Sequence, residues 1–229
     1  MDKVKKGEFI ALRYSGYAND KLFDSNKEGE IGKIHPNAKA KDFVIVVGKS
    51  MVVPGLDKAL EGKEIGKEYD LTVSPKEGFG LRDPKMVKTI PLKIFTEKQV
   101  MPQVGMVLNL DNMVAKIIAV SGARVITDFN NPLAGKELKY NFSIVRKVDD
   151  ESEKVQALFE VMFRAVPEFE IKDKVIVKGP KMLEIYVKAF SEQFKEILGK
   201  ELGFELKEKK ESEKNESKEK SEEEHKHTH

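Results

Sequence analysis

Few residues of this sequence are of the types that carry nucleophilic or metal-dependent chemistry. The chain has 229 residues, with four histidines and no cysteine. Without cysteine it has no thiolate nucleophile, no thiolate zinc site and no disulfide. His35 is the only histidine before residue 225, so a Ser-His-Asp triad would have to use it, in a predicted loop. P-loop, dinucleotide-binding and HExxH motifs are also absent. We therefore expect any catalysis to proceed without a nucleophile or a cofactor.

The other three histidines, His225, His227 and His229, lie at the end of a charged tail. Their i, i+2, i+4 spacing is compatible with weak binding of nickel or zinc, and a tail with no physiological metal is the alternative. Residues 207–229 contain no apolar side chain and mix Lys, Glu and Ser. Such a segment cannot offset the entropy of ordering, so we predict a disordered tail.

Composition and charge narrow the class of protein. The 41 basic residues nearly balance the 39 acidic ones, for a net charge of +2, which argues against a nucleic-acid partner. No apolar run reaches the roughly 18 residues of a membrane span. The first residues are charged where a signal peptide would need an apolar stretch. We expect a cytoplasmic protein without a membrane partner.

The first third of the chain has the pattern of a β-sheet with one short helix. Residues 9–17 and 43–47 are typical of strands, the second being a continuous apolar run. Pro54 and Gly55 open a short helix that ends at Leu60. Alternation over residues 68–73 predicts another strand, and 138–145 resumes this pattern after an interruption. We predict one domain made of residues 1–83 and 129–150.

Residues 84–128 form that interruption and are interpreted as a small all-β domain inserted into the first. Short strands over 106–110, 114–120 and 124–128 are separated by polar turn pairs. The insertion holds four of the chain's eight methionines, Met86, Met101, Met106 and Met113. Flexible thioethers suit a surface that accepts many apolar sequences, whereas core packing explains them equally well.

From residue 151 the pattern becomes that of a small α+β domain that ends at residue 206. Apolar residues from Val155 to Met162 share one helical face, and a second amphipathic helix covers 183–198 and ends near Gly199. A hairpin around Asp173 lies between them, and 204–206 supplies a last strand. A domain of this size is marginal alone, so we expect it to pack on a neighbour or to form a homodimer.

Four segments, in this order, resemble the signature elements of one family. They are residues 14–17 (YSGY) with 21–25 (KLFDS), 48–62 (GKSMVVPGLDKALEG), 74–80 (SPKEGFG) and 128–140 (DFNNPLAGKELKY). They are similar to those of the FKBP-type peptidyl-prolyl cis-trans isomerases, in the SlyD-like class with an inserted flap domain. The resemblance covers residues 1–150, and the layout with a further α+β domain resembles the long archaeal members. Asn131 stands where the family usually has histidine.

The resemblance implies a fold and a set of site residues. The fold is α+β, with an FKBP-like antiparallel sheet and short helix, an inserted all-β domain and a C-terminal α+β domain. Tyr14, Asp24 and Phe79 would be the catalytic residues, and the Val53 N–H would bind a substrate carbonyl. The substrate-binding residues would be Phe23, Phe43, Val52, Val53, Leu56, Leu133 and Tyr140. Leu56 replaces the tryptophan of the best-known members, as is usual in the SlyD-like class.

The activity implied is isomerisation of Xaa-Pro bonds in folding proteins. A twisted amide has less charge separation than a planar one, so an apolar pocket lowers the barrier without a nucleophile. The inserted domain would bind unfolded clients, with its methionines as the chaperone surface. The partners are then unfolded or partly folded proteins and Xaa-Pro peptides. Two alternatives stay open: a holdase whose pocket only binds, and a nickel-handling metallochaperone.

Overall fold

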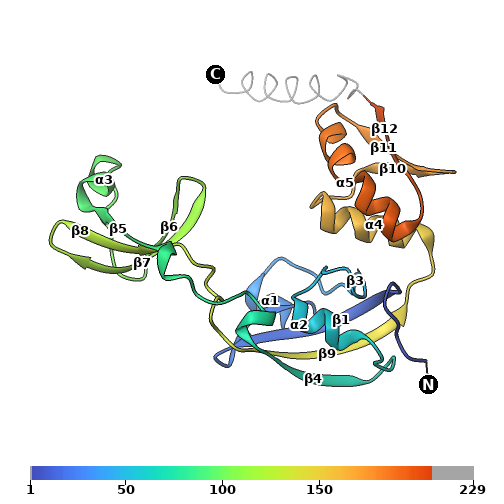
Figure 1. The fold of residues 1–229 in the computed structure, drawn as a ribbon, viewed down its shortest axis with the longest axis horizontal. Helices are drawn as coiled ribbons and strands as arrows, with labels where there is room; N and C mark the ends of the chain where they lie inside the picture. The colour runs from blue at the N-terminus through green and yellow to red at the C-terminus, as the bar shows by residue number, and fades with distance from the viewer. Residues whose placement is uncertain (1, 208–229) are drawn as a thin grey trace, which may run out of the picture. The chain divides into compact units, whose positions relative to one another are not determined.

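The computed structural model describes residues 2–207 (Figure 1). The predicted disorder of residues 208–229, and the metal binding considered for His225, His227 and His229, lie outside the described residues. The chain divides into two compact units. The first comprises the residues up to Arg146 except two short segments, Gly7–Ile10 and Val44–Val46. The second comprises these two segments and the residues from Lys147 onwards. No helix among the described residues is long and apolar enough to cross a membrane.

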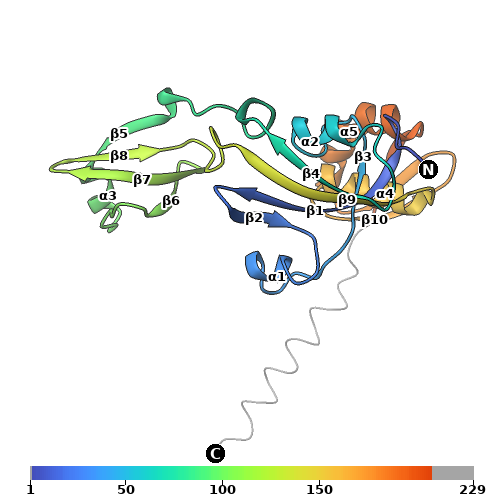
Figure 2. The ribbon, with the colours of Figure 1, turned by 90° about the horizontal axis from the view of Figure 1, so that it is seen from below.

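A five-stranded sheet contributes most of its residues to the first unit (Figures 1 and 2). Its order is β2-β1-β9-β4, and β3 pairs with β1. The strands are β1 (Phe9–Ala18), β2 (Lys21–Ser25), β3 (Phe43–Val46), β4 (Glu68–Val73) and β9 (Leu138–Lys147). Strand β9 lies between β1 and β4, so it belongs to the same sheet as the N-terminal strands.

The β1–β2 hairpin is shaped by local sequence. Asn19 and Asp20 connect the strands with φ of 51° and 57°, a conformation these residue types tolerate and two-residue hairpins require. The register shifts between Gly16 and Tyr17, which pair with Asp24 and Leu22, so Phe23 is the extra residue of a bulge in β2. Helix α1 (Ile31–Ile34) follows β2. The hairpin therefore presents residues of β1 and β2 with a fixed register.

Helix α2 (Pro54–Leu60) packs its apolar side into the core of this unit. Proline occupies its first turn, where the missing N–H costs nothing. The 3₁₀ turn η1 (Pro75–Glu77) follows β4. Buried side chains of this unit come from the helix and from strands β1, β4 and β9: Leu12, Leu56, Leu60, Val73, Leu138, Phe142 and Ile144.

The segment between η1 and β9 contains a second sheet, of order β5-β8-β7-β6. After the 3₁₀ turn η2 (Pro84–Met86) come β5 (Val87–Pro91), α3 (Leu92–Glu97), β6 (Val107–Leu110), β7 (Met113–Ser121) and β8 (Arg124–Asp128). The short helix α3 adds to the strands expected from the sequence. Its Phe95 is buried against Ile117 and Val125, so the helix closes one face of the sheet.

The second unit has the element order α-β-β-α-β that the sequence predicts. Its elements are α4 (Glu151–Met162), β10 (Glu168–Ile171), β11 (Val175–Gly179), α5 (Leu183–Leu198) and β12 (Leu202–Leu206). Phe159 and Phe194 are fully buried, and their rings stack with centroids 5.7 Å apart. Helix α5 ends at Gly199, whose φ of 77° is left-handed. Lys207, assigned to the tail from sequence, donates its N–H to the Gly179 carbonyl at 3.0 Å.

Candidate functional site

Five aromatic rings form a continuous chain of contacts in the first unit. Phe43 on β3 contacts Tyr14 on β1, and Tyr14 contacts Tyr140 on β9, with centroids 6.4 and 6.3 Å apart. Tyr140 meets Phe23 on β2 edge-on at 6.0 Å, and Phe23 meets Phe79 after η1 at 6.0 Å. Residues distant in sequence thus supply one aromatic surface. All five were expected from sequence to line a substrate pocket.

Gly16 makes room for this aromatic surface. A Cβ atom on Gly16 would lie 2.7 Å from Phe23 Cζ and 3.0 Å from Tyr140 Cε1. Real Cβ atoms do not approach other carbons so closely, because packed interiors leave no such overlap. Gly16 also pairs with Asp24 across the hairpin. Glycine at this position therefore lets two rings close over β1.

Asp24 is the acidic group beside these rings. The Tyr14 hydroxyl donates a hydrogen bond to Asp24 Oδ2 at 2.8 Å. Burial, followed by the negative charge of Asp24, raises the pKa of Tyr14 far above the usual phenol range. Burial and the same carboxylate also raise the pKa of Tyr140. Tyr14 is consequently a protonated donor over the physiological pH range, and it holds the Asp24 carboxylate in place.

Val52, Val53 and Leu56 lie at the start of α2. Val52 and Val53 are half-buried, while Leu56 is 1% exposed and belongs to the core. The Val53 carbonyl accepts the Asp57 N–H at 3.0 Å. Leu133 lies in the turn after Asn131, whose Oδ1 accepts the Leu133 N–H at 2.8 Å, and it is not part of the ring-to-ring contacts.

Sequence reasoning did not single out Asp57 or Asn26. The buried Asp57 carboxylate accepts the N–H groups of Gly48 and Ser50, both at 2.8 Å, and so fixes the turn that leads to Val52 and Val53. Asn26 accepts the Tyr14 N–H at 2.8 Å. The sequence did carry a signal for each residue. Asp57 is an acidic residue just inside a helix that begins with proline, and Asn26 is an asparagine directly after a strand; both types commonly bond nearby backbone groups at such positions.

The four methionines of the inserted segment occupy different environments. Met101 is 72% exposed and Met113 is 41% exposed. Met106 packs against the buried cluster around Phe95, and Met86 is half-buried at the end of η2. Two of the four therefore lie at the surface, and Met106 contributes to packing.

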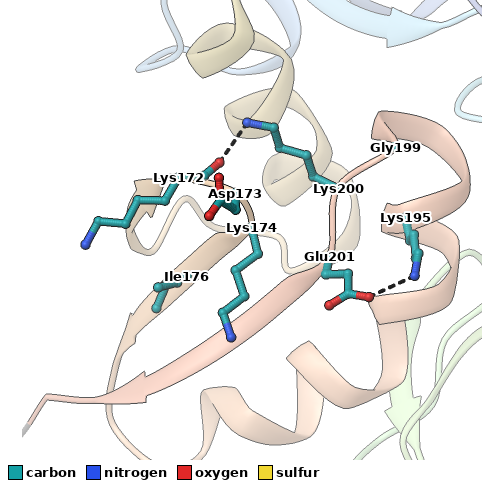
Figure 3. Close-up of a pocket in the computed structure, with 8 residues that line it drawn as sticks. All are labelled: Lys172, Asp173, Lys174, Ile176, Lys195, Gly199, Lys200 and Glu201. Atoms are coloured by element: carbon teal, nitrogen blue, oxygen red, sulfur yellow. Dashed lines mark hydrogen bonds and ion pairs between the residues drawn. The ribbon is translucent and has the colours of Figure 1, made fainter.

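A cavity of about 470 Å³ lies in the second unit and is lined by none of the five ring residues (Figure 3). Four lysines line it, and most of them form ion pairs with glutamate side chains. Lys195 pairs with Glu201 at 2.8 Å, and Lys200 pairs with Glu151 at 2.8 Å and bonds the Lys172 carbonyl. Within residues 2–207, no group of three or more acidic or histidine side chains is placed to hold a metal ion.

Comparisons with known proteins find two matching domain families and several similar proteins. Residues 1–96 match the model of the family "FKBP-type peptidyl-prolyl cis-trans isomerase", and residues 88–133 match that of "FKBP26, IF domain". A short-type peptidyl-prolyl cis-trans isomerase of Methanocaldococcus jannaschii is 33% identical over 145 residues, which are 62% of this chain and 92% of that protein. The isomerase SlyD of Escherichia coli is 32% identical over 147 residues, 62% of this chain and 69% of SlyD.

The family match includes four of the five ring residues, and Tyr140 on β9 lies beyond it. Strands β1 to β4, α2 and Phe79 lie within residues 1–96, and the second sheet lies largely within residues 88–133. The chain belongs to the family of FKBP-type peptidyl-prolyl cis-trans isomerases and carries the chaperone-type domain inserted in its flap.

Proposed function

We propose that the five-ring surface and Asp24 form the isomerase site. The observation that carries this proposal is the continuous chain of rings with one carboxylate held beside it by the Tyr14 hydroxyl at 2.8 Å. Rotation about an Xaa-Pro bond has a barrier of about 20 kcal/mol, most of it from lost amide resonance. A thousandfold acceleration needs only about 4 kcal/mol of preferential binding of the twisted amide.

Each group has a role in this mechanism. The rings of Phe23, Phe79 and Tyr140 surround the prolyl ring and exclude water, which favours the less polar twisted amide. The Val53 N–H, at the start of α2, holds a substrate carbonyl. Asp24 faces the reacting amide and is fixed by Tyr14. No step uses a nucleophile or a cofactor.

Exchange spectroscopy on a proline-containing tetrapeptide tests this site. We expect Asp24→Asn and Phe79→Ala each to lower kcat/KM at least tenfold. Asp20→Asn is the matched control, because Asp20 lies in the turn of the same hairpin with its side chain 85% exposed. Activity of Asp24→Asn and Phe79→Ala equal to that of the control would refute the assignment. A protein that binds the peptide without accelerating its exchange would instead be a holdase.

The inserted sheet supports a client-binding surface. Eight large apolar side chains of this segment are exposed, namely Ile94, Met101, Val104, Val107, Met113, Val114, Ile118 and Val120. We therefore place client capture on the exposed Met101 and Met113 with the neighbouring valines, rather than on Met86 and Met106. Soluble proteins seldom expose so many apolar side chains in one small region without a binding role.

Paired isosteric variants test that surface. Val107→Thr with Val114→Thr keeps side-chain shape on exposed strand positions and adds hydroxyls. We expect weaker suppression of client aggregation and unchanged tetrapeptide exchange. Val166→Thr is the control, because Val166 is 43% exposed in the second unit. Equal suppression of client aggregation by the double variant and by Val166→Thr would contradict the proposed surface.

A second copy of the chain is the partner we propose for α5. Ile185 is 72% exposed and Tyr186 43% exposed, and Met182, 65% exposed, precedes them at helical spacing. The rings of Phe163 and Phe190 extend this surface from Tyr186, with the centroids of Tyr186 and Phe163 5.8 Å apart and those of Phe163 and Phe190 5.9 Å apart. Light scattering should give a dimer mass that Ile185→Lys reduces to a monomer while Leu81→Lys does not. A monomer at all concentrations would refute the dimer.

The cytoplasmic location stays a prediction.

A further inference from the structure

Asn26 connects three segments of the first unit through its side-chain amide. Its Oδ1 accepts the Tyr14 N–H at 2.8 Å, and its Nδ2 donates to the carbonyls of Leu12 at 2.8 Å and Lys41 at 3.0 Å. Its own backbone N–H donates to the Tyr14 carbonyl at 3.2 Å. The carbonyl oxygen and both N–H bonds of the amide are thus engaged. Strand β2 ends at Ser25, and Asn26 extends the hydrogen bonding to β1 by one more residue.

Each connected segment carries a residue of the isomerase site. Tyr14 is bound directly by the amide. Phe43, which contacts the Tyr14 ring, comes two residues after Lys41, and Asp24 comes two residues before Asn26. One amide group therefore joins the segments of Tyr14, Phe43 and Asp24, in addition to the pairing of β1 with β2 and β3.

A side-chain pair between the segments of β1 and β3 is more exposed than Asn26. Arg13 pairs with Asp42 at 2.5 Å, with the arginine side chain 54% exposed. Solvent and salt weaken such surface pairs, and they contribute little to holding a geometry. The hydrogen bonds of Asn26 to Tyr14 and Leu12 are partly buried. Loss of a partner there leaves backbone groups unsatisfied, which costs more than loss of an exposed pair.

We propose that Asn26 is a positioning residue of the isomerase pocket, holding Tyr14 and Phe43 at the spacing that the twisted amide requires. The inference rests on the pocket proposed above. Displacements of about 1 Å in a positioned group are enough to lower catalytic rates by as much as a hundredfold. Asn26 does not touch the substrate in this account, and it acts only through the β1 and β3 segments.

The test compares two variants of Asn26 with a matched asparagine. Asn26→Ala removes all three side-chain bonds, whereas Asn26→Asp keeps the acceptor for Tyr14 but directs an oxygen at the carbonyls of Leu12 and Lys41. Asn141→Ala is the control, because the Asn141 amide bonds the side chains of Lys27 and Asp70 and no pocket residue. We expect kcat/KM for the tetrapeptide to fall at least tenfold in Asn26→Ala and less than twofold in Asn141→Ala.

Ring resonances of ¹³C-labelled tyrosine and phenylalanine provide a readout independent of activity. In Asn26→Ala we expect the signals of Tyr14 and Phe43 to shift while that of Phe79 stays in place. In Asn26→Asp we expect Phe43 to shift more than Tyr14. If Asn26→Ala does not fold, the isosteric Asn26→Asp decides the question by the same signals.

Two results separate this inference from the pocket assignment. A lower melting temperature with native ring signals and native activity would show that Asn26 only stabilises the fold, and would overturn the proposal. Shifted signals of Tyr14 and Phe43, together with full activity of Asp24→Asn and Phe79→Ala, would support positioning by Asn26 and refute the pocket itself.

Discussion

Single residues shape the aromatic surface of this protein. Gly16 leaves the space into which the rings of Phe23 and Tyr140 close. Asp24 and the Tyr14 hydroxyl fix each other through one hydrogen bond. At this scale, the site depends as much on an absent Cβ atom and a held carboxylate as on the rings.

Substitution of Gly16 by alanine should damage activity more than stability. The new methyl would overlap two rings, and overpacking of this kind typically costs about 1–3 kcal/mol. We expect a fall of tenfold or more in tetrapeptide exchange and a modest loss of melting temperature. Gly32→Ala is the control, because a Cβ there meets no atom within 4 Å and Gly32 lies in α1. Equal activity of the two variants would contradict the role given to Gly16.

The buried phenols predict a distinct response to alkaline pH. The folded pKa values of Tyr14 and Tyr140 lie above the unfolded value of about 10. Their contribution to stability is complete below pH 10 and is lost as pH rises towards the folded pKa values, because only the unfolded chain releases these protons. Absorbance at 295 nm should show two tyrosines that ionise only on unfolding, and Tyr14→Phe should remove one. Ionisation of all five tyrosines in the folded protein would contradict this prediction.

At the scale of elements, strand β8 combines a tight core with one unsatisfied polar group. Thr127 is fully buried beside the cluster of Phe95, Ile117 and Val125. Its Oγ1 has no hydrogen-bond partner among the residues that the structure describes. Thr127 lies opposite Lys88 of β5 and Ile117 of β7, and the register of β7 shifts between Ile117 and Ala119. The inserted sheet is therefore less stable than its apolar packing alone would make it.

Thr127→Val should stabilise the inserted sheet. Valine keeps the branched shape and the β-propensity while removing a hydroxyl whose burial costs about 1–3 kcal/mol when unpaired. Hydrogen exchange of the β7 and β8 amides should slow accordingly. Thr89→Val, at an exposed position of β5, should leave exchange nearly unchanged. Faster exchange in Thr127→Val would indicate that the hydroxyl has a partner.

At the scale of the whole molecule, the segment that enters the inserted domain and the segment that leaves it are bonded to each other. Asn130 accepts the Asp83 N–H at 2.8 Å and donates to the Asp83 carbonyl at 3.0 Å. Arg82 pairs with Asp128, and the Gly135 N–H donates to the Gly80 carbonyl at 2.8 Å. Because the ends of the insertion meet, the first unit can be closed without it.

Replacement of residues 84–128 by two glycines should separate the two activities. The rings and Asp24 lie outside the deleted segment, so tetrapeptide exchange should stay within about threefold. Catalysis of proline-limited refolding should fall by more than tenfold, because capture of the client raises its effective concentration at the pocket. Equal losses on both substrates would contradict a client-binding role of the insertion. A circular dichroism spectrum with intact sheet signal is the control for folding.

The sequence determined the motifs and most of the element order. Apolar periodicity located α4, α5 and the return strand β9, because burial of one face imposes a pattern that the chain itself carries. The order of four signature segments indicated the family. Glycine and proline marked α2 and the end of α5 for local steric reasons.

Only the tertiary structure decided how those parts meet. The contact of Phe43 with Tyr14, the roles of Asn26 and Asp57, and the space left by Gly16 depend on segments far apart in the chain. The division of the methionines between core and surface depends in the same way on α3 and its Phe95. Local patterns report which face of an element is buried, whereas the partner that buries it is set by long-range packing.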